Sequence, residues 1–162
     1  MRKIIILTCL PALFLTTACK RTLPDYGTTA TVKMSNGWWV NYSLGGTAQL
    51  PKPVFYSTYN TAANTTDSMW IDDLGLFWDF KGTVAIDYKS LTFSNPMCIN
   101  TYYVDTAKVA NGKVLLKAGH SKTGVATDSI YFEIQFSDDS PTYGNTYIVS
   151  GTARTGIIAD DY

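Results

Sequence analysis

The stretch LFWDFKGTVAIDY, residues Leu76 to Tyr88, indicates the fold most clearly. Six of its large apolar side chains share one parity: Leu76, Trp78, Phe80, Val84, Ile86 and Tyr88. The other parity holds Asp79, Lys81, Thr83 and Asp87. Side chains of a β-strand alternate between two faces, so this pattern predicts one long strand with a buried and a wetted face. Gly82 interrupts the apolar face, where a bulge or bend would let the strand curl.

The rest of the chain repeats this alternation in shorter segments. Ile130 to Phe136 shows it clearly, and further strands are expected at residues 38–44, 54–59, 68–72, 99–104, 113–118 and 146–152. Turn residues separate these segments, and Asn111-Gly112 is the strongest signal for a hairpin. About eight strands with short turns predict an all-β protein, either an antiparallel up-and-down β-barrel or a β-sandwich. The length of the strand at 76–88 favours the barrel.

The first nineteen residues have the organisation of an export signal. Arg2 and Lys3 precede an apolar stretch from Ile4 to Leu15, and small residues then lead to Cys19. The apolar stretch is shorter than the about 20 residues that span a bilayer, which suits a secretory signal peptide. A small residue directly before a cysteine is the pattern that a lipoprotein signal peptidase cleaves, although the usual leucine is displaced by one position. We therefore predict lipidation of Cys19 as the first mature residue, with an ordinary cleaved signal peptide as the alternative.

After this signal, residues 20–35 are polar and predict a tether, and residues 36–162 predict a single domain. Without Arg2 and Lys3 the chain has eleven basic and thirteen acidic residues and no basic patch, so we expect no nucleic-acid partner. Cys9 lies within the signal. Cys98 then has no intramolecular partner, so neither a disulfide framework nor a cysteine metal site is expected.

The only segment that suggests catalysis is Gly119-His120-Ser121. It resembles the start of a nucleophile elbow, but Thr123 stands where that motif requires glycine, and a polar turn follows instead of a helix. His120 is the only histidine, and Ser121 beside it would point the other way in an extended chain. We therefore expect no catalytic residues. A single histidine without cysteines also predicts no metal site and no other cofactor.

The aromatic content is the most informative feature for binding: four Trp, eleven Tyr and seven Phe. An eight-stranded barrel has an interior that side chains fill or that holds one small ligand. The candidate ligand-binding residues are Trp38, Trp70, Trp78, Phe80, Tyr88, Phe132 and His120. A packed core is the alternative for each of the apolar ones. Trp38 and Trp39 cannot both face inward, because neighbours in a strand face opposite ways.

Several segments together carry a resemblance to a known family: YNTAANTTDSMWIDD (59–73), FWDFK (77–81), LTFS (91–94), GHSKTGVATDSIYFEIQFSDD (119–139) and SGTARTG (150–156). They resemble a Bacteroidetes lipoprotein family labelled lipid-binding putative hydrolase. The resemblance covers most of the chain from about Gly37 onward. It implies a lipocalin-like fold and a small β-barrel of the outer membrane or periplasm.

Two functions of different classes follow from these observations. The first is a lipid-anchored binding protein that holds a small apolar or amphipathic ligand in its barrel. The second is a structural or accessory lipoprotein of an outer-membrane complex, with a filled core and an outward-facing tryptophan that contacts a protein partner. A hydrolase is third. Lys20-Arg21 follows Cys19 where surface-displayed lipoproteins of this group carry acidic residues, so we expect an outer-membrane protein that faces the periplasm rather than the cell surface.

Overall fold

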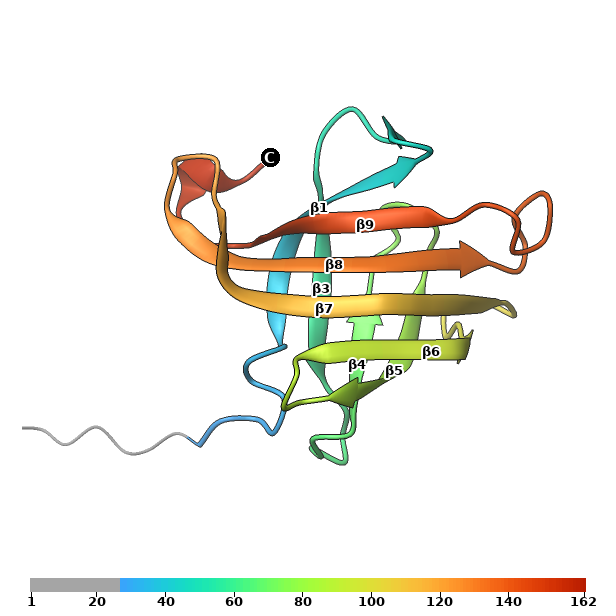
Figure 1. The fold of residues 1–162 in the computed structure, drawn as a ribbon, viewed down its shortest axis with the longest axis horizontal. Coiled ribbons are helices and arrows are strands. Elements are labelled where there is room, and N and C mark those ends of the chain that lie inside the picture. Colours follow the sequence, from blue (N-terminus) through green and yellow to red (C-terminus); the bar gives the residue numbers. More distant parts are fainter. Residues whose placement is uncertain (1–26) are drawn as a thin grey trace, which may run out of the picture.

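The computed structural model describes residues 27–162 (Figure 1). The predicted signal, with Cys9 and Cys19, lies outside the described residues. The strands are β1 (Asn36–Leu44), β2 (Thr47–Ala48), β3 (Val54–Asn60), β4 (Ser68–Asp72), β5 (Lys81–Asp87), β6 (Thr92–Ile99), β7 (Thr106–His120), β8 (Ala126–Phe136) and β9 (Tyr147–Ala153). A short 3-10 helix, η1 (Ile158–Asp160), follows β9. None of the helical structure in residues 27–162 is long and apolar enough to cross a membrane.

The strands form one closed antiparallel barrel. Its order is β1-β3-β4-β5-β6-β7-β8-β9, and β2 is an extra strand paired with the end of β1. Closure comes from β1 and β9, whose pairing runs from Trp38 opposite Ala153 to Ser43 opposite Ile148. In Figure 1, β6 to β9 cross the front of the molecule, and β3, β4 and β5 run steeply behind them. The predicted eight-stranded barrel is confirmed, and the sandwich alternative is wrong.

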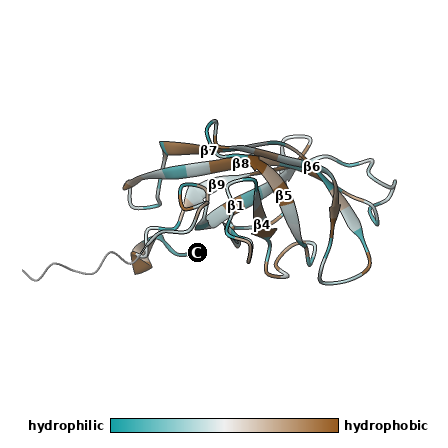
Figure 2. Ribbon diagram, turned by 90° about the horizontal axis from the view of Figure 1, so that it is seen from below, coloured by the Kyte–Doolittle hydropathy of each residue, from teal (hydrophilic) through white to brown (hydrophobic). Residues whose placement is uncertain are grey.

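The core follows from strand parity. Many inward-facing side chains of the strands, together with Phe80 just before β5, are at most 2% exposed: Trp38, Val40, Tyr56, Met69, Ile71, Phe80, Val84, Ile130, Phe132 and Ile134. Figure 2 shows β6, β7 and β8 as the upper layer, with β1, β4 and β5 beneath them. Burial of this apolar surface between the two layers is the main term that stabilises the barrel.

The predicted strand from Leu76 to Tyr88 is wrong in its first part. β5 begins only at Lys81, and residues 73–80 form a loop that precedes it. Positive φ angles mark this loop: 55° at Leu74, 72° at Gly75 and 47° at Asp79. A strand does not accommodate such angles. The alternation before Lys81 therefore belongs to a folded loop rather than to a strand.

The burial of the side chains in residues 76–88 is nevertheless close to the prediction. Phe80 and Val84 are buried, at 1% exposure each, and Trp78 and Ile86 are partly buried. Leu76, at 46% exposure, is the exception. The apolar residues thus reach the core from two different backbone geometries.

Asn111-Gly112 does not form the predicted hairpin. It lies within β7, where the pairing with β8 shifts between Ala110 and Lys113. Asn111 has a φ of 54°, and a Cβ at Gly112 would collide with the ring of Phe93. Both a tight hairpin turn and a bulge use a residue in the left-handed region, so the dipeptide alone does not distinguish them. Here the bulge bends a 15-residue strand around the barrel.

The strand predicted at residues 99–104 is mostly a loop, and the actual strand, β6, ends at Ile99. Pro96 lies within β6, and the pairing with β7 shifts from Phe93 to Asn95 and again from Asn95 to Cys98. Proline cannot donate a ladder hydrogen bond, so its presence hides the strand in the sequence.

The N-terminal part of the described chain closes one end of the barrel. Residues 30–35 form a turn in which the Met34 amide donates to the Thr31 carbonyl at 2.8 Å. The Met34 side chain is fully buried, and the Thr58 hydroxyl donates to the Met34 carbonyl at 2.5 Å. The last part of the stretch expected to be a tether therefore packs as part of the barrel.

We expect Phe80→Ala to lower the free energy of unfolding by about 3–5 kcal/mol, because the substitution leaves a cavity in a close-packed core. Chemical denaturation measures the change. Leu76→Ala, in the same loop but half exposed, serves as the control and should change stability by about 0.5 kcal/mol or less. Equal effects of the two substitutions would contradict the assignment of Phe80 to the core.

Candidate functional site

The interior of the barrel is filled by side chains. Trp38, Phe80 and Phe132, three of the predicted ligand-binding residues, face inward at 0–1% exposure. The ring of Phe132 contacts those of Tyr56 and Phe93, at centroid distances of 5.4 and 5.6 Å. A ligand inside the barrel would have to displace these rings. In this conformation the three residues form a core rather than an open cup.

One end of the barrel carries four loops, residues 45–53, 73–80, 100–105 and 137–146, and we call this end the mouth. Two aromatic rings from the loop 73–80 cover the core there. Phe77 stacks on Tyr42 with ring centroids 3.9 Å apart, and Trp78 stacks on Phe136 at 4.6 Å with nearly parallel planes. We call Phe77 and Trp78 the plug. The predicted ligand-binding residue Trp78 thus closes the mouth.

The carboxylate of Asp73 holds the plug in place. Asp73 is fully buried. Its Oδ1 accepts the backbone N–H groups of Gly75 at 2.9 Å and Phe80 at 2.8 Å, and its Oδ2 accepts that of Trp78 at 2.8 Å. Burial raises the pKa of Asp73, against the opposing effect of the three N–H donors. Three bonds to one side chain fold residues 73–80 into a compact loop.

A hydroxyl group is left unpaired in the core. The Tyr56 hydroxyl is buried and has no hydrogen-bond partner among residues 27–162. Burial raises the pKa of Tyr56, and the nearby Tyr42 and Asp73 raise it further. Leaving a buried polar group unpaired costs about 1–3 kcal/mol, so this hydroxyl is a free hydrogen-bonding group for anything that reaches past the plug.

Two open hollows lie at the mouth and share Tyr103 as a wall. One has a volume of about 640 Å³ and is lined by Leu74, Gly75, Asp79, Tyr102 and Tyr103. The other has a volume of about 700 Å³ and is lined by Ile99, Asn100, Thr101, Tyr103, Val104, Asp105, Thr106 and Ser137. Together these two hollows form the candidate site.

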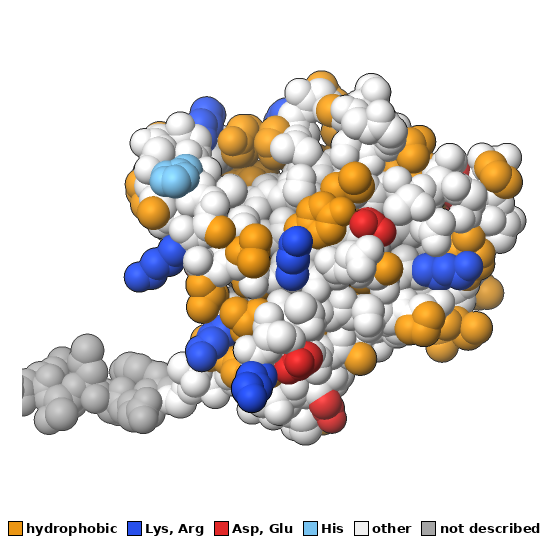
Figure 3. Space-filling view, viewed as in Figure 1, with side chains coloured by type: hydrophobic (Ala, Val, Ile, Leu, Met, Phe, Trp, Pro, Cys, Tyr) orange, Lys and Arg blue, Asp and Glu red, His pale blue; other side chains and the backbone are white. Residues whose placement is uncertain are grey.

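The edge of the second hollow is strongly apolar. Met97 and Ile99 are about 70% exposed, and Val104 is fully exposed. Figure 3 shows apolar side chains gathered over the right-hand end of β6, where this edge lies. Exposed aliphatic side chains clustered beside a hollow typically mark a ligand or interaction site.

The tyrosines of the mouth are held by carboxylates. The Tyr102 hydroxyl donates to Asp72 Oδ1 and the Tyr103 hydroxyl to Asp138 Oδ2, each at 2.7 Å. The indole N–H of Trp78 also donates to Asp138, at 2.7 Å. Burial and the accepting carboxylate raise the pKa values of both tyrosines, so both hydroxyls remain protonated donors at neutral pH. These bonds fix the orientation of the rings that line the first hollow.

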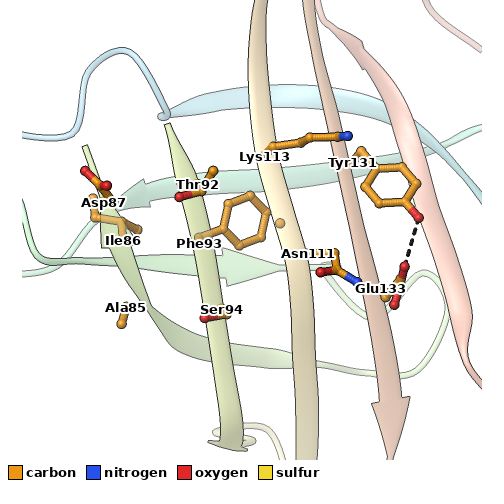
Figure 4. A pocket seen from close by; sticks show the side chains of 11 residues that line it. Ala85, Ile86, Asp87, Thr92, Phe93, Ser94, Asn111, Lys113, Tyr131 and Glu133 are labelled. Carbon is orange, nitrogen blue, oxygen red and sulfur yellow. Dashed lines mark hydrogen bonds between the residues drawn. The ribbon is translucent and has the colours of Figure 1, made fainter. Parts of the chain in front are cut away.

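A further hollow, of about 720 Å³, lies on the outer face of β5 to β8 (Figure 4). Lys113 and Tyr131 lie side by side there, with the Lys113 ammonium 5.0 Å from the centre of the Tyr131 ring. The Tyr131 hydroxyl donates to Glu133 at 3.0 Å. Most of its lining side chains are polar, and three of them already interact with one another. This groove is therefore less suited to an apolar ligand than the mouth.

The remaining predicted site residues lie apart from the mouth. Trp70 faces outward from β4, with the Lys81 ammonium 5.3 Å from its ring centre. The Tyr88 hydroxyl accepts the backbone N–H of Lys33 at 3.2 Å, near the closed end of the barrel. His120 is exposed at the end of β7. The structure thus does not bring these three residues together with Trp78.

Ser121 has a local structural role in the turn after β7. Its Oγ accepts the Val125 N–H at 3.1 Å and lies 3.4 Å from Thr123 Oγ1. Among residues 27–162, no hydrogen bond joins His120 to Ser121. The pair therefore lacks the contact by which a histidine activates a serine nucleophile.

Trp39, the outward-facing partner of Trp38, is covered by the end of the chain itself. Its indole N–H donates to Asp161 at 3.2 Å, and its ring packs against Tyr162 with centroids 5.6 Å apart. Arg154 holds Asp161 through two bonds, of 2.8 and 2.5 Å. The exposed tryptophan that suggested a protein partner is therefore accounted for within the chain.

The residues at the mouth escape sequence reasoning because the alternation places 99–104 in a strand. A signal is nevertheless present in Tyr102-Tyr103-Val104. Three consecutive large side chains cannot all face inward from a strand, so at least one must be exposed. The same reasoning applies to Trp38-Trp39, where the structure confirms opposite orientations.

Comparison with known proteins adds one match. A family model described as lipid-binding putative hydrolase matches residues 23–158. No curated protein matches the chain in sequence.

The C-terminal segment over Trp39 should loosen in acid. Thr155 Oγ1 and the Thr123 N–H donate to Asp160 at 2.6 and 2.7 Å, and these bonds lower the pKa of Asp160 to about 2, from the ordinary 3.8. A carboxylate with a lowered pKa stabilises the fold above its ordinary pKa, and this contribution is lost as the pH falls from about 4 to about 2. Melting temperatures of wild type and Asp160→Asn should therefore differ at pH 5 and converge toward pH 2. A difference that stays constant with pH would contradict this role.

Proposed function

The chain belongs to the family described as lipid-binding putative hydrolase, and we propose that it binds an amphipathic, lipid-class ligand at the mouth of its barrel. The observation that carries this proposal is the exposed aliphatic edge of the 700 Å³ hollow, formed by Ile99 and Val104. Exposing such side chains to water is unfavourable, and a bound acyl chain would cover them.

The size and chemistry of the mouth fit such a ligand. Hollows of about 300–1,000 Å³ are typical of small-molecule sites, and both hollows fall in that range. Ile99 and Val104 form the aliphatic edge of one hollow, and the other combines two tyrosines with Asp79. An amphipathic molecule would place its chain against the first and its polar group in the second.

A ligand with a longer acyl chain would reach the core only if the side chains of the plug moved. Withdrawal of Phe77 and Trp78 would uncover Tyr42 and Phe136, on which they stack. It would also give access toward the unpaired Tyr56 hydroxyl. The plug therefore limits the depth to which a ligand enters in the observed conformation.

We further propose that Cys19 carries lipid and anchors the protein to the outer membrane, facing the periplasm. The support is the signal-like order of residues 1–19. Residues 30–35 close the end of the barrel opposite the mouth. An anchor at that end would leave the mouth facing away from the membrane.

The geometry favours binding over hydrolysis as the activity of this barrel. Ser121 and His120 lie on the turn after β7, at the end of the strands opposite the mouth. The proposed ligand site and the only sequence signal for catalysis are therefore separated by the length of the barrel.

Binding at the mouth is testable with N-phenyl-1-naphthylamine, a neutral apolar probe whose fluorescence rises in an apolar site. We expect saturable binding to wild type and at least fivefold weaker binding to Val104→Ser, because the substitution removes apolar contact area. Ile158→Ser, at a strongly exposed aliphatic position near the opposite end, is the matched control and should bind as wild type does. Absence of saturable binding, or equal loss in both variants, would overturn the proposal.

Lipid anchoring predicts a shift in fractionation. Cys19→Ala should move the protein from the membrane to the soluble fraction, and mass spectrometry of the wild-type N-terminal peptide should show acyl groups on Cys19. Cys9→Ala, within the same signal segment, should stay in the membrane fraction. Protease treatment of intact cells should spare the domain, and its removal would contradict the periplasmic orientation.

A further inference from the structure

Acidic residues predominate in the loops of the mouth. The loops 73–80, 100–105 and 137–146 contain five aspartates and no lysine, arginine or histidine, although the whole chain has equal numbers of acidic and basic residues. The fourth loop, 45–53, contains one basic residue, Lys52. The aspartates are Asp73, Asp79, Asp105, Asp138 and Asp139. Clefts lined by one sign of charge attract ligands of the opposite sign.

The lysines that border these loops are engaged elsewhere. Lys81 pairs with Asp72 at 3.8 Å, and its ammonium lies over the outward-facing rings of Tyr59 and Trp70. Lys108 lies 4.2 Å from the ring centre of Tyr143. Neither lysine forms an ion pair with Asp79, Asp105 or Asp138 among the described residues. Lys81 and Lys108 thus do not neutralise the carboxylates of Asp79, Asp105 and Asp138.

A buried carboxylate oxygen supplies independent evidence. Asp105 is 8% exposed and lines the 700 Å³ hollow. Ser137 donates to one of its oxygens, while its Oδ2 has no hydrogen-bond partner within residues 27–162. Burial raises the pKa of Asp105, and the neighbouring Asp138 carboxylate raises it further. A buried, unpaired carboxylate oxygen is costly, and a positive group nearby would remove much of that cost.

The first hollow has the aromatic walls that suit an organic cation. Tyr102 and Tyr103 line it together with Asp79, and their hydroxyls are fixed by donation to carboxylates. An ammonium group is attracted both to the faces of aromatic rings and to a carboxylate. The backbone carbonyl of Asp79 accepts from the Asn100 amide at 3.0 Å, but its carboxylate accepts no hydrogen bond from a described residue and is exposed beside the hollow.

We propose that the ligand held at the mouth carries a positively charged ammonium head group, seated between Tyr102, Tyr103 and Asp79. Its apolar chain then lies along the aliphatic edge at Val104, with Tyr103 between the two parts. This inference rests on the proposed function, because it specifies the ligand of the same site. It distinguishes an ammonium amphiphile from a fatty acid or other anionic lipid.

The direct test compares three amphiphiles of equal chain length by calorimetry at concentrations below self-association: decyltrimethylammonium, decanol and decanoate. We expect decyltrimethylammonium to bind at least tenfold more tightly than decanoate, with decanol between them. Tetramethylammonium, the head group without a chain, should bind much more weakly than decyltrimethylammonium. If tetramethylammonium binds as tightly as decyltrimethylammonium, the proposal that the ligand is an amphiphile is overturned, and the mouth is a site for a small cation.

Variants separate the head-group contacts from the chain contacts. Asp79→Asn should weaken binding of decyltrimethylammonium at least threefold and leave that of decanol unchanged. Asparagine tolerates the positive φ of position 79, so the fold is expected to persist. Asp87→Asn, the same change at the opposite end of the barrel, should have no effect on either probe. Tyr103→Phe should retain most of the affinity that Tyr103→Leu loses, because the ring face makes the contact.

The outcomes distinguish this inference from the proposed function. Equal binding of all three amphiphiles, or tighter binding of decanoate, overturns the cationic head group while the mouth remains a lipid site. Loss of decyltrimethylammonium binding in Asp87→Asn to the same extent as in Asp79→Asn also overturns it. Failure of decyltrimethylammonium, decanol and decanoate to bind overturns both.

Discussion

The buried carboxylate of Asp73 is the constraint on which the rest of the mouth depends. By accepting three backbone N–H groups it turns residues 73–80 back on themselves, and so determines where β5 begins. The same fold of the loop presses Phe77 and Trp78 onto the core. It also leaves Leu74 and Asp79 exposed beside a hollow. One side chain therefore couples closure of the barrel to the construction of its candidate site.

Because side chains fill the interior of the barrel, the accessible candidate site lies at one end of it, the mouth. Rings such as Trp38 and Phe132 occupy the space that a ligand takes in a hollow barrel. What remains accessible is an aliphatic edge, two fixed tyrosines and several carboxylates. Apolar surface and charge lie side by side there, and this combination matches an amphipathic molecule better than a purely apolar one. Membership of a lipid-binding family agrees with a site of this kind.

The two ends of the barrel differ in how they are closed. At one end, Met34 and the turn of residues 30–35 seal the core with a buried side chain. At the other end, the plug belongs to the loop of residues 73–80, which is held mainly by hydrogen bonds to the Asp73 carboxylate. A loop with exposed neighbours opens more easily than a buried core segment. The asymmetry gives the molecule one fixed end, next to the N-terminal segment, and one end suited to exchange with solvent.

The sequence by itself determined the all-β class, the bounds of β4 and the opposite orientations of Trp38 and Trp39, because alternation of side chains is a local property of an extended backbone. It also indicated part of the core, including Phe80 and Phe132. Only the tertiary structure decided that residues 73–80 are a loop, that Asn111-Gly112 is a bulge and that residues 100–105 form part of the mouth. Each of these depends on a partner that the local pattern does not contain: Asp73 accepts from Phe80, Gly112 meets Phe93, and Tyr102 donates to Asp72, thirty residues away.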